Sequence, residues 1–402
     1  MASLISLFSG AGGLDLGLEA AGFDLKLCVE KDEPCQRTIA SNRPRWKLAQ
    51  PPDIFRLLPQ DIQKQASVRR RSLDLLAGGP PCQPFSKAGY WHSGDSLRLR
   101  DPRAKTLHAY MKIVSGLLPQ VILLENVEGI GFEKKDEGLS LLKRKLREIN
   151  RKHGTHYDPV VFRINAADFG VPQVRKRIFL IAARDGTRFR PPIPTHGDQR
   201  LPYITAWDAI GDLEWETDGT LQPKGTWTKL LPSIPEGKNY QWHTPRGAGR
   251  PIFGFRRRYW SFLLKLAKER PSWTIPAQPG PSTGPFHWKN RLLFVRELAR
   301  LQSFPDDYIL SGNRRAAQRQ IGNAVPPLIG EIIGREIAEQ LLGEAPMNGY
   351  LRFSIKRRQE CPCPEATTEV PNPYVPLMRN HRAHPGKGKG PGVLSRRFVR
   401  AL

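Results

Sequence analysis

The fold class follows from the segment SLISLFSGAGGLDLGLEAA, which occupies residues 3–21. Residues 4–8 form a short apolar run that predicts a strand, and residues 13–21 carry apolar side chains at helical spacing. Between them, glycines allow the backbone to approach a ligand closely at the helix N-terminus. This strand, glycine turn and helix predict the first unit of an α/β sheet with a ligand site at its edge.

The same alternation of strands and helices continues to about residue 185. Further strands are predicted at 25–29, 73–77, 121–124, 160–165 and 178–183, and helices at 106–118 and 139–151. Such alternation favours a doubly wound, mostly parallel sheet, here ending in a hairpin. We therefore expect an α/β domain over residues 1–185, completed by a helix within residues 318–343, whose amphipathic part is 327–342.

The sequence changes character at about residue 186, where Pro, Gly, Trp and Arg are scattered without a period. This pattern predicts a smaller, loop-rich second domain over residues 186–317, with a helix at 291–302. Beyond about 344 the chain is poor in apolar residues, and from Met347 onward it carries eleven Lys or Arg and three Glu. We expect residues 344–402 to form a basic, disordered tail.

The chain has 63 Lys and Arg against 38 Asp and Glu, a formal net charge of +25 over 402 residues. Neutralisation of nucleic acid phosphates is the commonest reason for such an excess, so we expect a nucleic acid partner. The alternative is a solubility feature or a general basic bias. No apolar run reaches about eighteen residues, which excludes a membrane-spanning helix.

Five cysteines in a chain of this length do not form a disulfide framework. That suits a reducing cytosol, in which a catalytic thiol stays free. Cys361 and Cys363 form a C-P-C sequence, but a zinc site needs two more ligands, and His381 and His384 are only remote candidates. We expect no bound metal.

Cys82 stands in the sequence GPPCQPFS at residues 79–86, directly after the apolar run 73–78. A strand that ends in Gly-Gly-Pro-Pro cannot continue smoothly into another regular element, because proline fixes φ and has no N–H to donate to a ladder. We therefore expect the thiol on a stiff turn at the carboxyl end of a strand, where open α/β sheets place their ligands.

Two carboxylates are candidates for contacts with a nucleotide-type cofactor. Glu30 ends the second predicted strand, close to the spacing at which an acidic residue bonds ribose hydroxyls. The glycine turn is not a full G-x-G-x-x-G, because Asp15 stands three residues after Gly12, and this favours a smaller adenosine-bearing cofactor over a dinucleotide. Asp53 is suited to an adenine amino group. The alternatives are an ordinary βα turn and a solvated loop aspartate.

Glu125 and two arginines are candidates for the reaction itself. Glu125 follows an apolar strand, where partial desolvation raises the pKa of a carboxyl and suits it to act as a general acid. The alternative is a helix N-cap region that uses Asn126. Arg175 and Arg177 alternate in the loop before a strand, so both are expected on one face, where they suit a phosphate or a carbonyl oxygen. The alternative is a solvated basic loop.

Together these groups meet the requirements of methyl transfer to carbon 5 of cytosine. A thiolate that adds at carbon 6 makes carbon 5 enamine-like, while a neutral carboxyl protonates N3 and an arginine holds O2. Carbon 5 then attacks a sulfonium methyl group, and loss of the C5 proton with β-elimination releases the thiol. Because carbon 5 lies inside the duplex stack, the base must be flipped out.

Six short motifs occur in one order along the chain. They are FSGAGG at residues 8–13, GPPC at 79–82, ENV at 125–127, QVRKR at 173–177, RELARLQSFP at 296–305 and QIGNAVP at 320–326. In these motifs and their order, over about residues 3–340, the chain resembles the bacterial DNA cytosine-5 methyltransferases of restriction–modification systems. The tail after about residue 344 has no counterpart in that resemblance.

The resemblance implies that Cys82 is the nucleophile and that Glu125 contacts the N3 and N4 edge of the flipped cytosine. Arg177 then contacts the O2 atom, with Arg175 nearby. The implied cofactor is S-adenosyl-L-methionine, bound by the Rossmann-like sheet. Its expected binding residues are Phe8, Gly10, Gly12, Gly13, Glu30, Asp53, Pro80 and Asn323.

The implied substrate is double-stranded DNA. Gln83 and Ser86 fall in a loop that closes over DNA in the family, and residues 186–317 correspond to the target-recognition domain. Arginine on guanine is the commonest specific contact. The expected DNA contacts in this domain are Arg256, Arg257, Arg258 and Arg291.

Four other residues of the second domain are expected to serve its structure or its contacts. Trp273 and Trp288 are candidates for core or base-stacking positions. Arg296 and Glu297 are expected to support the domain rather than to act in catalysis.

The resemblance also implies a biological setting. We expect a monomeric, cytoplasmic and nucleoid-associated modification enzyme without membrane contact, and a cognate restriction endonuclease that acts on the same site without a stable complex. Two other functions stay open, namely a same-fold enzyme that methylates tRNA and an inactive DNA-binding module. The intact Cys82, Glu125 and Arg177 argue against the inactive module.

Overall fold

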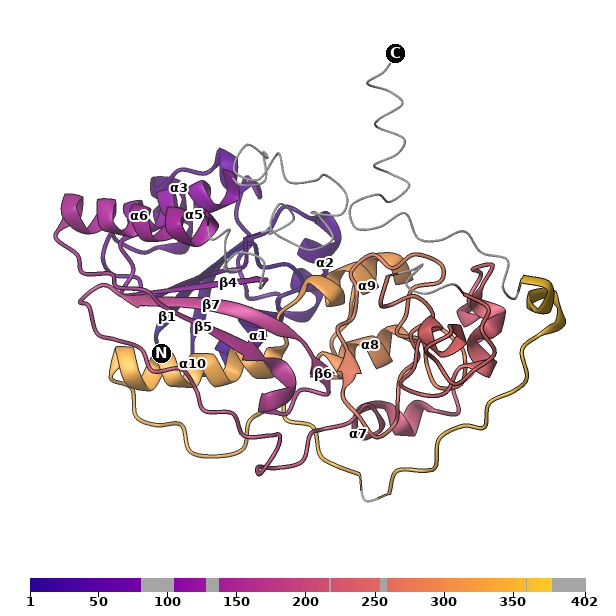
Figure 1. Cartoon of the computed structure of the whole chain (residues 1–402). Coiled ribbons are helices and arrows are strands. Elements are labelled where there is room, and N and C mark those ends of the chain that lie inside the picture. The colour runs from indigo at the N-terminus through magenta and orange to yellow at the C-terminus, as the bar shows by residue number, and fades with distance from the viewer. Residues whose placement is uncertain (81–104, 128–136, 217, 254–258, 359, 378–402) are drawn as a thin grey trace, which may run out of the picture.

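The computed structural model describes residues 1–80, 105–127, 137–216, 218–253, 259–358 and 360–377. Its centre is a six-stranded sheet in the order β2-β1-β3-β4-β7-β5 (Figure 1). The strands are β1 (Ser3–Leu7), β2 (Asp24–Val29), β3 (Leu75–Gly78), β4 (Val121–Val127), β5 (Val160–Asn165) and β7 (Lys176–Ala183). The first four are parallel, and β7 is antiparallel to both β4 and β5. The predicted doubly wound, mostly parallel sheet with a final antiparallel pair is confirmed.

Helices cover both faces of this sheet. One face carries α1 (Gly13–Ala20) and α10 (Pro327–Leu342), and the other carries α3 (Pro59–Ala66), α5 (Lys105–Leu117) and α6 (Glu137–His153) (Figure 1). Successive side chains of a strand point to opposite faces, so Leu75 and Ala77 of β3 join one hydrophobic cluster and Leu76 joins the other. A sheet that is covered twice needs strands that are apolar throughout, which is why they were visible in the sequence.

In the described ranges, three helices of eight or more residues were not predicted from the sequence: α2 (Glu33–Asn42), α3 and α9 (Arg314–Asn323). Each contains few apolar residues, so the helical period is weak. The helix predicted at 327–342 is confirmed as α10, whereas the one predicted at 291–302 is shorter, as α8 (Val295–Leu301). The Glu297 carboxylate accepts the Phe294 N–H at 2.7 Å, and this cap sets the start of α8.

The region 186–317 is built from short elements. Besides α8 it holds α7 (Ala206–Ile210), β8 (Ser272–Trp273) and several 3₁₀ turns. It has its own hydrophobic cluster, which includes Leu230, Tyr240 and Phe262. Strand β8 pairs in parallel with β6 (Gln173–Val174), directly before β7, and so joins this region to the central sheet's last hairpin.

Residues 344–377 differ from the expected disordered tail. Their described residues contain one 3₁₀ helix at Asn372–Leu377 and otherwise chain without regular secondary structure, yet Phe353, Val370 and Tyr374 are buried. The segment leaves α10, runs along the lower side of the molecule in Figure 1 and ends against the loop-rich region. The expectation of disorder is wrong here, because a few spaced apolar side chains suffice to hold an extended chain on a hydrophobic surface. Residues 378–402 lie outside the described part.

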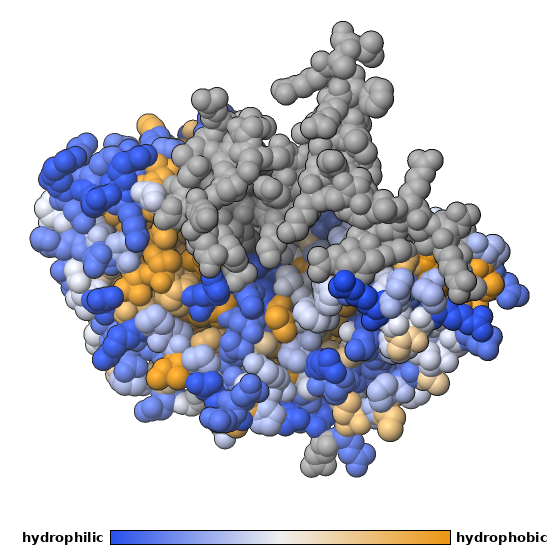
Figure 2. All heavy atoms as spheres, in the orientation of Figure 1, coloured by the Kyte–Doolittle hydropathy of each residue, from blue (hydrophilic) through white to orange (hydrophobic). Residues whose placement is uncertain are grey.

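The surface in view is predominantly hydrophilic over the described residues (Figure 2), in line with the 25% of charged residues in the chain. Within the described ranges, no helix combines the length and apolar character needed to cross a bilayer.

Helices α1 and α10 pack so closely that their contact requires glycine. A Cβ at Gly17 would lie 2.2 Å from the Pro327 carbonyl oxygen, and one at Gly330 would lie 2.7 Å from the Leu14 carbonyl oxygen. Overlap with backbone atoms cannot be relieved by a side-chain rotation, so the helices themselves would have to move. The contact therefore fixes α10 against the first helix of the sheet.

Replacing Gly17 by Ala is expected to lower the free energy of unfolding by about 1–3 kcal/mol through overpacking, although alanine in a helix interior is favoured over glycine by roughly 1 kcal/mol. The measurement is the urea midpoint of unfolding. Gly219→Ala is the control, because nothing lies within 4 Å of a Cβ at that position. A Gly17→Ala variant as stable as the control would contradict the packing argument.

Candidate active site

A cavity of about 430 Å³ opens at the carboxyl ends of β1 to β4. Its walls come from the turns after β1, β2 and β3, from the end of β4 and from the turn between α9 and α10. Among the residues expected at functional positions, it gathers Phe8, Gly10, Gly13, Glu30, Asp53, Pro80, Glu125, Arg177 and Asn323. The lining does not include Gly12 or Arg175.

The turn between β1 and α1 owes its shape to Gly12. This residue caps α1 with φ of 73°, in the left-handed region that favours glycine. A Cβ there would lie 3.0 Å from the Tyr308 hydroxyl and 3.2 Å from the Trp46 ring. The Tyr308 hydroxyl also donates to the Ala11 carbonyl oxygen at 2.7 Å. Gly12 thus supports the turn from behind, while Gly10 and Gly13 face the cavity.

The Glu30 carboxylate holds the same turn from the β2 side. Its Oε2 accepts the Gly10 N–H at 2.7 Å, and its Oε1 accepts the Asp32 N–H at 2.6 Å. Burial raises the pKa of Glu30, and the two backbone hydrogen bonds offset part of that rise. Since each carboxylate oxygen can accept a second hydrogen bond, Glu30 has capacity left for a ligand hydroxyl.

Asp53 also lines the cavity. It accepts the Phe55 N–H at 3.1 Å, capping the 3₁₀ helix Ile54–Arg56, and pairs with Lys31 Nζ at 2.7 Å. The hydrogen bond from Lys31 is the main cause that lowers the pKa of Asp53. The side chain is therefore a carboxylate at neutral pH and an acceptor for a ligand amino group.

Glu125 and Arg177 lie side by side on the antiparallel strands β4 and β7. Arg177 Nε is 2.9 Å from Glu125 Oε1, and Glu125 is 8% exposed. Burial raises the pKa of Glu125, while Arg177 and Arg175 offset part of that rise. A Cβ at Gly79 would lie 3.3 Å from Glu125 Oε2, so the turn after β3 passes close to this carboxyl.

Arg175 does not occupy the catalytic position expected for it. The side chain is 1% exposed, and its Nη2 donates to the carbonyl oxygens of Gly322 at 2.9 Å and Ala324 at 2.7 Å. β6 ends at Val174 and β7 begins at Lys176, so Arg175 falls in the break between strands and turns inward. Its contacts fix the turn between α9 and α10, which carries Asn323.

Several predicted residues lie outside the described part of the chain, namely Cys82, Gln83, Ser86, Arg256, Arg257 and Arg258. Pro80 is the last described residue before Cys82. It lines the cavity, and its carbonyl oxygen accepts a hydrogen bond from Asn126 Nδ2 at 3.3 Å. The described chain therefore leads to the cavity two residues before the expected nucleophile.

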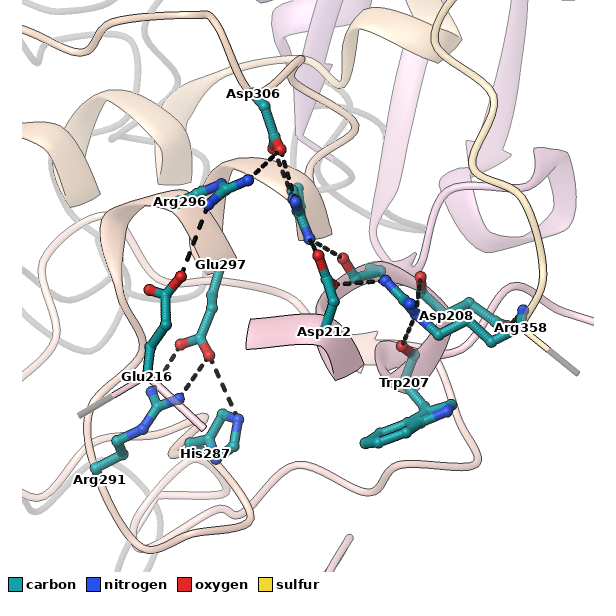
Figure 3. Close-up of polar contacts among 12 residues, drawn as sticks. Trp207, Asp208, Asp212, Glu216, His287, Arg291, Arg296, Glu297, Asp306 and Arg358 are labelled. Atoms are coloured by element: carbon teal, nitrogen blue, oxygen red, sulfur yellow. Dashed lines mark hydrogen bonds and ion pairs between the residues drawn. The ribbon is translucent and has the colours of Figure 1, made fainter. Parts of the chain in front are cut away.

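Arg291 is a partner of Glu297 and not an exposed DNA contact, which corrects the sequence prediction. Its two terminal nitrogens donate to the two Glu297 oxygens at 2.8 and 2.7 Å, and both side chains are buried (Figure 3). Arg296, which was expected with Glu297 to support the domain, pairs with Asp306 at 2.7 Å. Trp288 is fully buried in the core.

Several polar residues of the cavity were not predicted as site residues, among them Asp15 and Arg319. Asp15 is fully buried, and burial raises its pKa to about 7, against the smaller lowering influence of Ser6. An acid inside an apolar helical period was a signal for Asp15. No such signal marked Arg319, which pairs with Asp32 at 2.9 Å, because α9 itself was not predicted.

The described ranges contain no group of three or more His, Cys, Asp or Glu residues placed to hold a metal ion.

Comparison with known proteins identifies the family. The model of the C-5 cytosine-specific DNA methylase family matches residues 2–339. The type II methyltransferase M.SacI of Streptomyces achromogenes is 35% identical over 370 residues, covering 84% of this chain and 93% of the relative. The type II methyltransferase M1.HphI of Haemophilus parahaemolyticus is 32% identical over 349 residues, covering 85% and 87%.

Solved structures agree on the fold. A prophage-encoded DNA modification methyltransferase (E. coli) superimposes with a TM-score of 0.61 at 24% identity, covering 86% of this chain and all of the other. DNMT2 of Spodoptera frugiperda gives a TM-score of 0.59 at 18% identity, covering 85% of this chain and all of the other. Because the family model matches residues 2–339, the chain belongs to the C-5 cytosine-specific DNA methylase family and is a DNA cytosine-5 methyltransferase.

Proposed function

We propose that the cavity binds S-adenosyl-L-methionine and that a cytosine flipped out of duplex DNA meets its methyl group beside Glu125 and Arg177. The observation that carries this proposal is the 2.9 Å pair between these two side chains, at the edge of a cavity that also holds Glu30 and Asp53. A carboxyl suited to proton donation thus lies next to carboxylates suited to a ribose and an adenine.

The residues present fit the cofactor. The cavity volume of about 430 Å³ falls in the range of roughly 300–1,000 Å³ that is typical of small-molecule sites. The remaining lone pairs of Glu30 suit the ribose hydroxyls, and Asp53 suits the adenine amino group. The N-terminus of α1 and Asn323 suit the methionine carboxylate. When bound, the cofactor supplies the sulfonium methyl group.

Glu125 and Arg177 are assigned complementary tasks on the cytosine. Because burial raises the pKa of Glu125, a larger share of this carboxyl is protonated near neutral pH and can donate to N3. Arg177 holds O2, where charge develops as the ring is activated. Arg175 serves as a positioning residue, since it bonds the main chain beside Asn323 and does not reach the cavity.

Cys82 is the proposed nucleophile on the ground of its GPPC motif and its position two residues beyond Pro80 in the sequence. Its thiolate forms a bond to carbon 6, and carbon 5 takes the methyl group. The C5 proton then leaves, and the carbon–sulfur bond breaks to restore the thiolate and the aromatic ring. The closing loop with Gln83 and Ser86, and Arg256 to Arg258, are retained as proposed DNA contacts.

We place this activity in a restriction–modification system, because the relatives at 35% and 32% identity are named type II methyltransferases. A restriction endonuclease would act on the same sequence without a stable complex, and the enzyme would act as a monomer associated with the nucleoid. The region 186–317 would read the target sequence. The tRNA alternative is supported only by a fold likeness at 18% identity.

Replacing Cys82 by Ala is expected to abolish methyl transfer, because alanine lacks the thiol that is proposed to add to carbon 6. The measurement is bisulfite sequencing of plasmid DNA from cells that express the protein. Wild type should protect cytosines in one short motif, and the variant should protect none while it still binds S-adenosyl-L-methionine. Protected cytosines in the variant would refute the covalent mechanism.

Replacing Glu125 by Gln is expected to lower the methylation rate by about 10²–10⁴-fold, the usual contribution of a general acid. The wild-type rate should fall as pH rises through the raised pKa of Glu125, since the proton to be donated is then lost, and the variant should lack this limb. Single-turnover methylation against pH measures both. Glu148→Gln, at an exposed carboxylate of α6, is the control, and a Glu125→Gln variant of wild-type rate would exclude the acid role.

Binding to a duplex of the target sequence is expected to weaken by about a thousandfold or more between roughly 50 and 200 mM salt, if the excess of 25 positive charges neutralises phosphates. Fluorescence anisotropy with a labelled duplex gives the slope of log affinity against log salt. Cofactor affinity, measured alongside, should change little. A flat salt response of DNA binding would remove the charge argument.

A further inference from the structure

We propose that residues 351–377 are a structural part of the target-recognition domain and that Glu365 and Tyr374 position this domain for sequence discrimination. The inference rests on the proposed role of residues 186–317 in reading the target sequence. Neither Glu365 nor Tyr374 lines the catalytic cavity, so their effect on DNA recognition can be separated from catalysis.

The segment is first anchored on the catalytic side. The Glu331 carboxylate of α10 is fully buried and accepts the N–H groups of Arg352 at 2.9 Å and Phe353 at 3.2 Å. Arg335, one turn further along α10, pairs with the same carboxylate at 2.7 Å. Phe353 packs into the main hydrophobic cluster. The chain therefore leaves the catalytic domain along a fixed path.

The segment next crosses α7 of the loop-rich domain. The Arg358 N–H donates to Asp208 Oδ1 at 2.7 Å, and the Arg358 guanidinium reaches Asp212 and the Trp207 carbonyl oxygen (Figure 3). The Trp207 indole N–H donates in turn to the Glu360 carbonyl oxygen. Hydrogen bonds donated by the segment and by Trp207 of α7 therefore hold Arg358 and Glu360 against α7.

Glu365 then completes a buried charge cluster. The Lys268 ammonium, with 2% of its side chain exposed, lies 2.7 Å from Glu365 Oε1 and 3.4 Å from Glu236 Oε1. The Glu365 N–H donates to Glu236 at 2.8 Å, and Lys289 lies 3.1 Å from the Glu365 carboxylate. A buried ammonium is tolerated only when carboxylates compensate it. Glu365 thus adds the shortest of three ion pairs around Lys268, and the other two come from Glu236 and Glu214 of the loop-rich domain.

Tyr374 finally enters the hydrophobic cluster of the loop-rich domain, together with Val370. Its ring stacks on Trp227 with centroids 5.6 Å apart, and Trp227 contacts Phe253 at 5.0 Å. The Tyr374 hydroxyl donates to the Thr226 carbonyl oxygen at 2.5 Å. A series of aromatic contacts, one stacked and one tilted, thus runs from the C-terminal segment to Phe253.

Phe253, at the end of these aromatic contacts, connects the C-terminal segment to the proposed DNA contacts. Phe253 stands three residues before Arg256 in the sequence, the first of three consecutive arginines proposed to contact DNA. The C-terminal segment therefore holds Phe253, the last described residue before the proposed DNA contacts. Removal of these aromatic contacts is expected to weaken the discrimination between target sequences. Because the contacts lie outside the cavity, cofactor binding should stay unchanged.

The test compares Tyr374→Ala with Tyr374→Phe. For each, kcat and KM are measured on the duplex found by bisulfite sequencing and on duplexes with one base pair changed, and cofactor affinity is measured by calorimetry. A changed base pair typically weakens binding by roughly 5- to 150-fold, so Tyr374→Ala should lower the discrimination between duplexes on the order of tenfold. Tyr374→Phe keeps the ring and should stay near wild type, as should Tyr350→Ala, whose side chain on the neighbouring stretch is 99% exposed.

Glu365→Gln is a second variant, which removes the compensating charge without changing the shape of the side chain. It should also lower discrimination and leave cofactor affinity unchanged. Undiminished discrimination in folded Tyr374→Ala and Glu365→Gln proteins would overturn the inference, as would an equal loss of cofactor affinity, which would indicate a general folding role. A wild type without site-selective methylation would instead refute the proposed function, and this inference with it.

Discussion

The cavity depends on one close backbone contact, between Gly13 at the N-terminus of α1 and the turn that precedes α10. A Cβ at Gly13 would lie 2.2 Å from the Val325 carbonyl oxygen, so only glycine allows these two segments to meet. The contact brings Asn323 into the same cavity as Phe8, although they are far apart in the sequence. Arg175 holds the same turn through two carbonyl oxygens. The turn before α10 therefore fixes the position of the glycine turn after β1 relative to Arg175, which lies between β6 and β7.

Much of the fold could be predicted because the sheet is apolar on both faces and its strands stand out as apolar runs. Helix α10 was found for the same reason, since its apolar period is strong. Helices α2 and α9 were not found, because polar contacts support them; Thr38 of α2, for example, donates to Gln320 of α9 at 2.7 Å. A bond between side chains so distant in the sequence leaves no local pattern to detect.

The candidate site was predictable where topology alone decides. Glu30 and Glu125 were identified because each stands at the end of a strand, and the carboxyl ends of parallel strands meet at one edge. The arginines were harder, because the exposure of an arginine depends on partners that the sequence does not connect to it. Arg291 forms a buried ion pair with Glu297, and Arg358 forms an ion pair with Asp212. Part of the positive charge thus stabilises the second domain instead of facing DNA.

The path of residues 351–377 has a consequence for how this domain is made and exchanged. Because Glu365 supplies one of the carboxylates around Lys268, the loop-rich domain gains its full set of ion pairs only after the ribosome has finished α10 and the segment beyond it. Recombination that replaces residues 186–317 alone would combine a new domain with a segment 351–377 that does not match its interior. Under the proposed role of residues 186–317 in reading the target, a change of specificity by recombination would have to carry residues 351–377 as well.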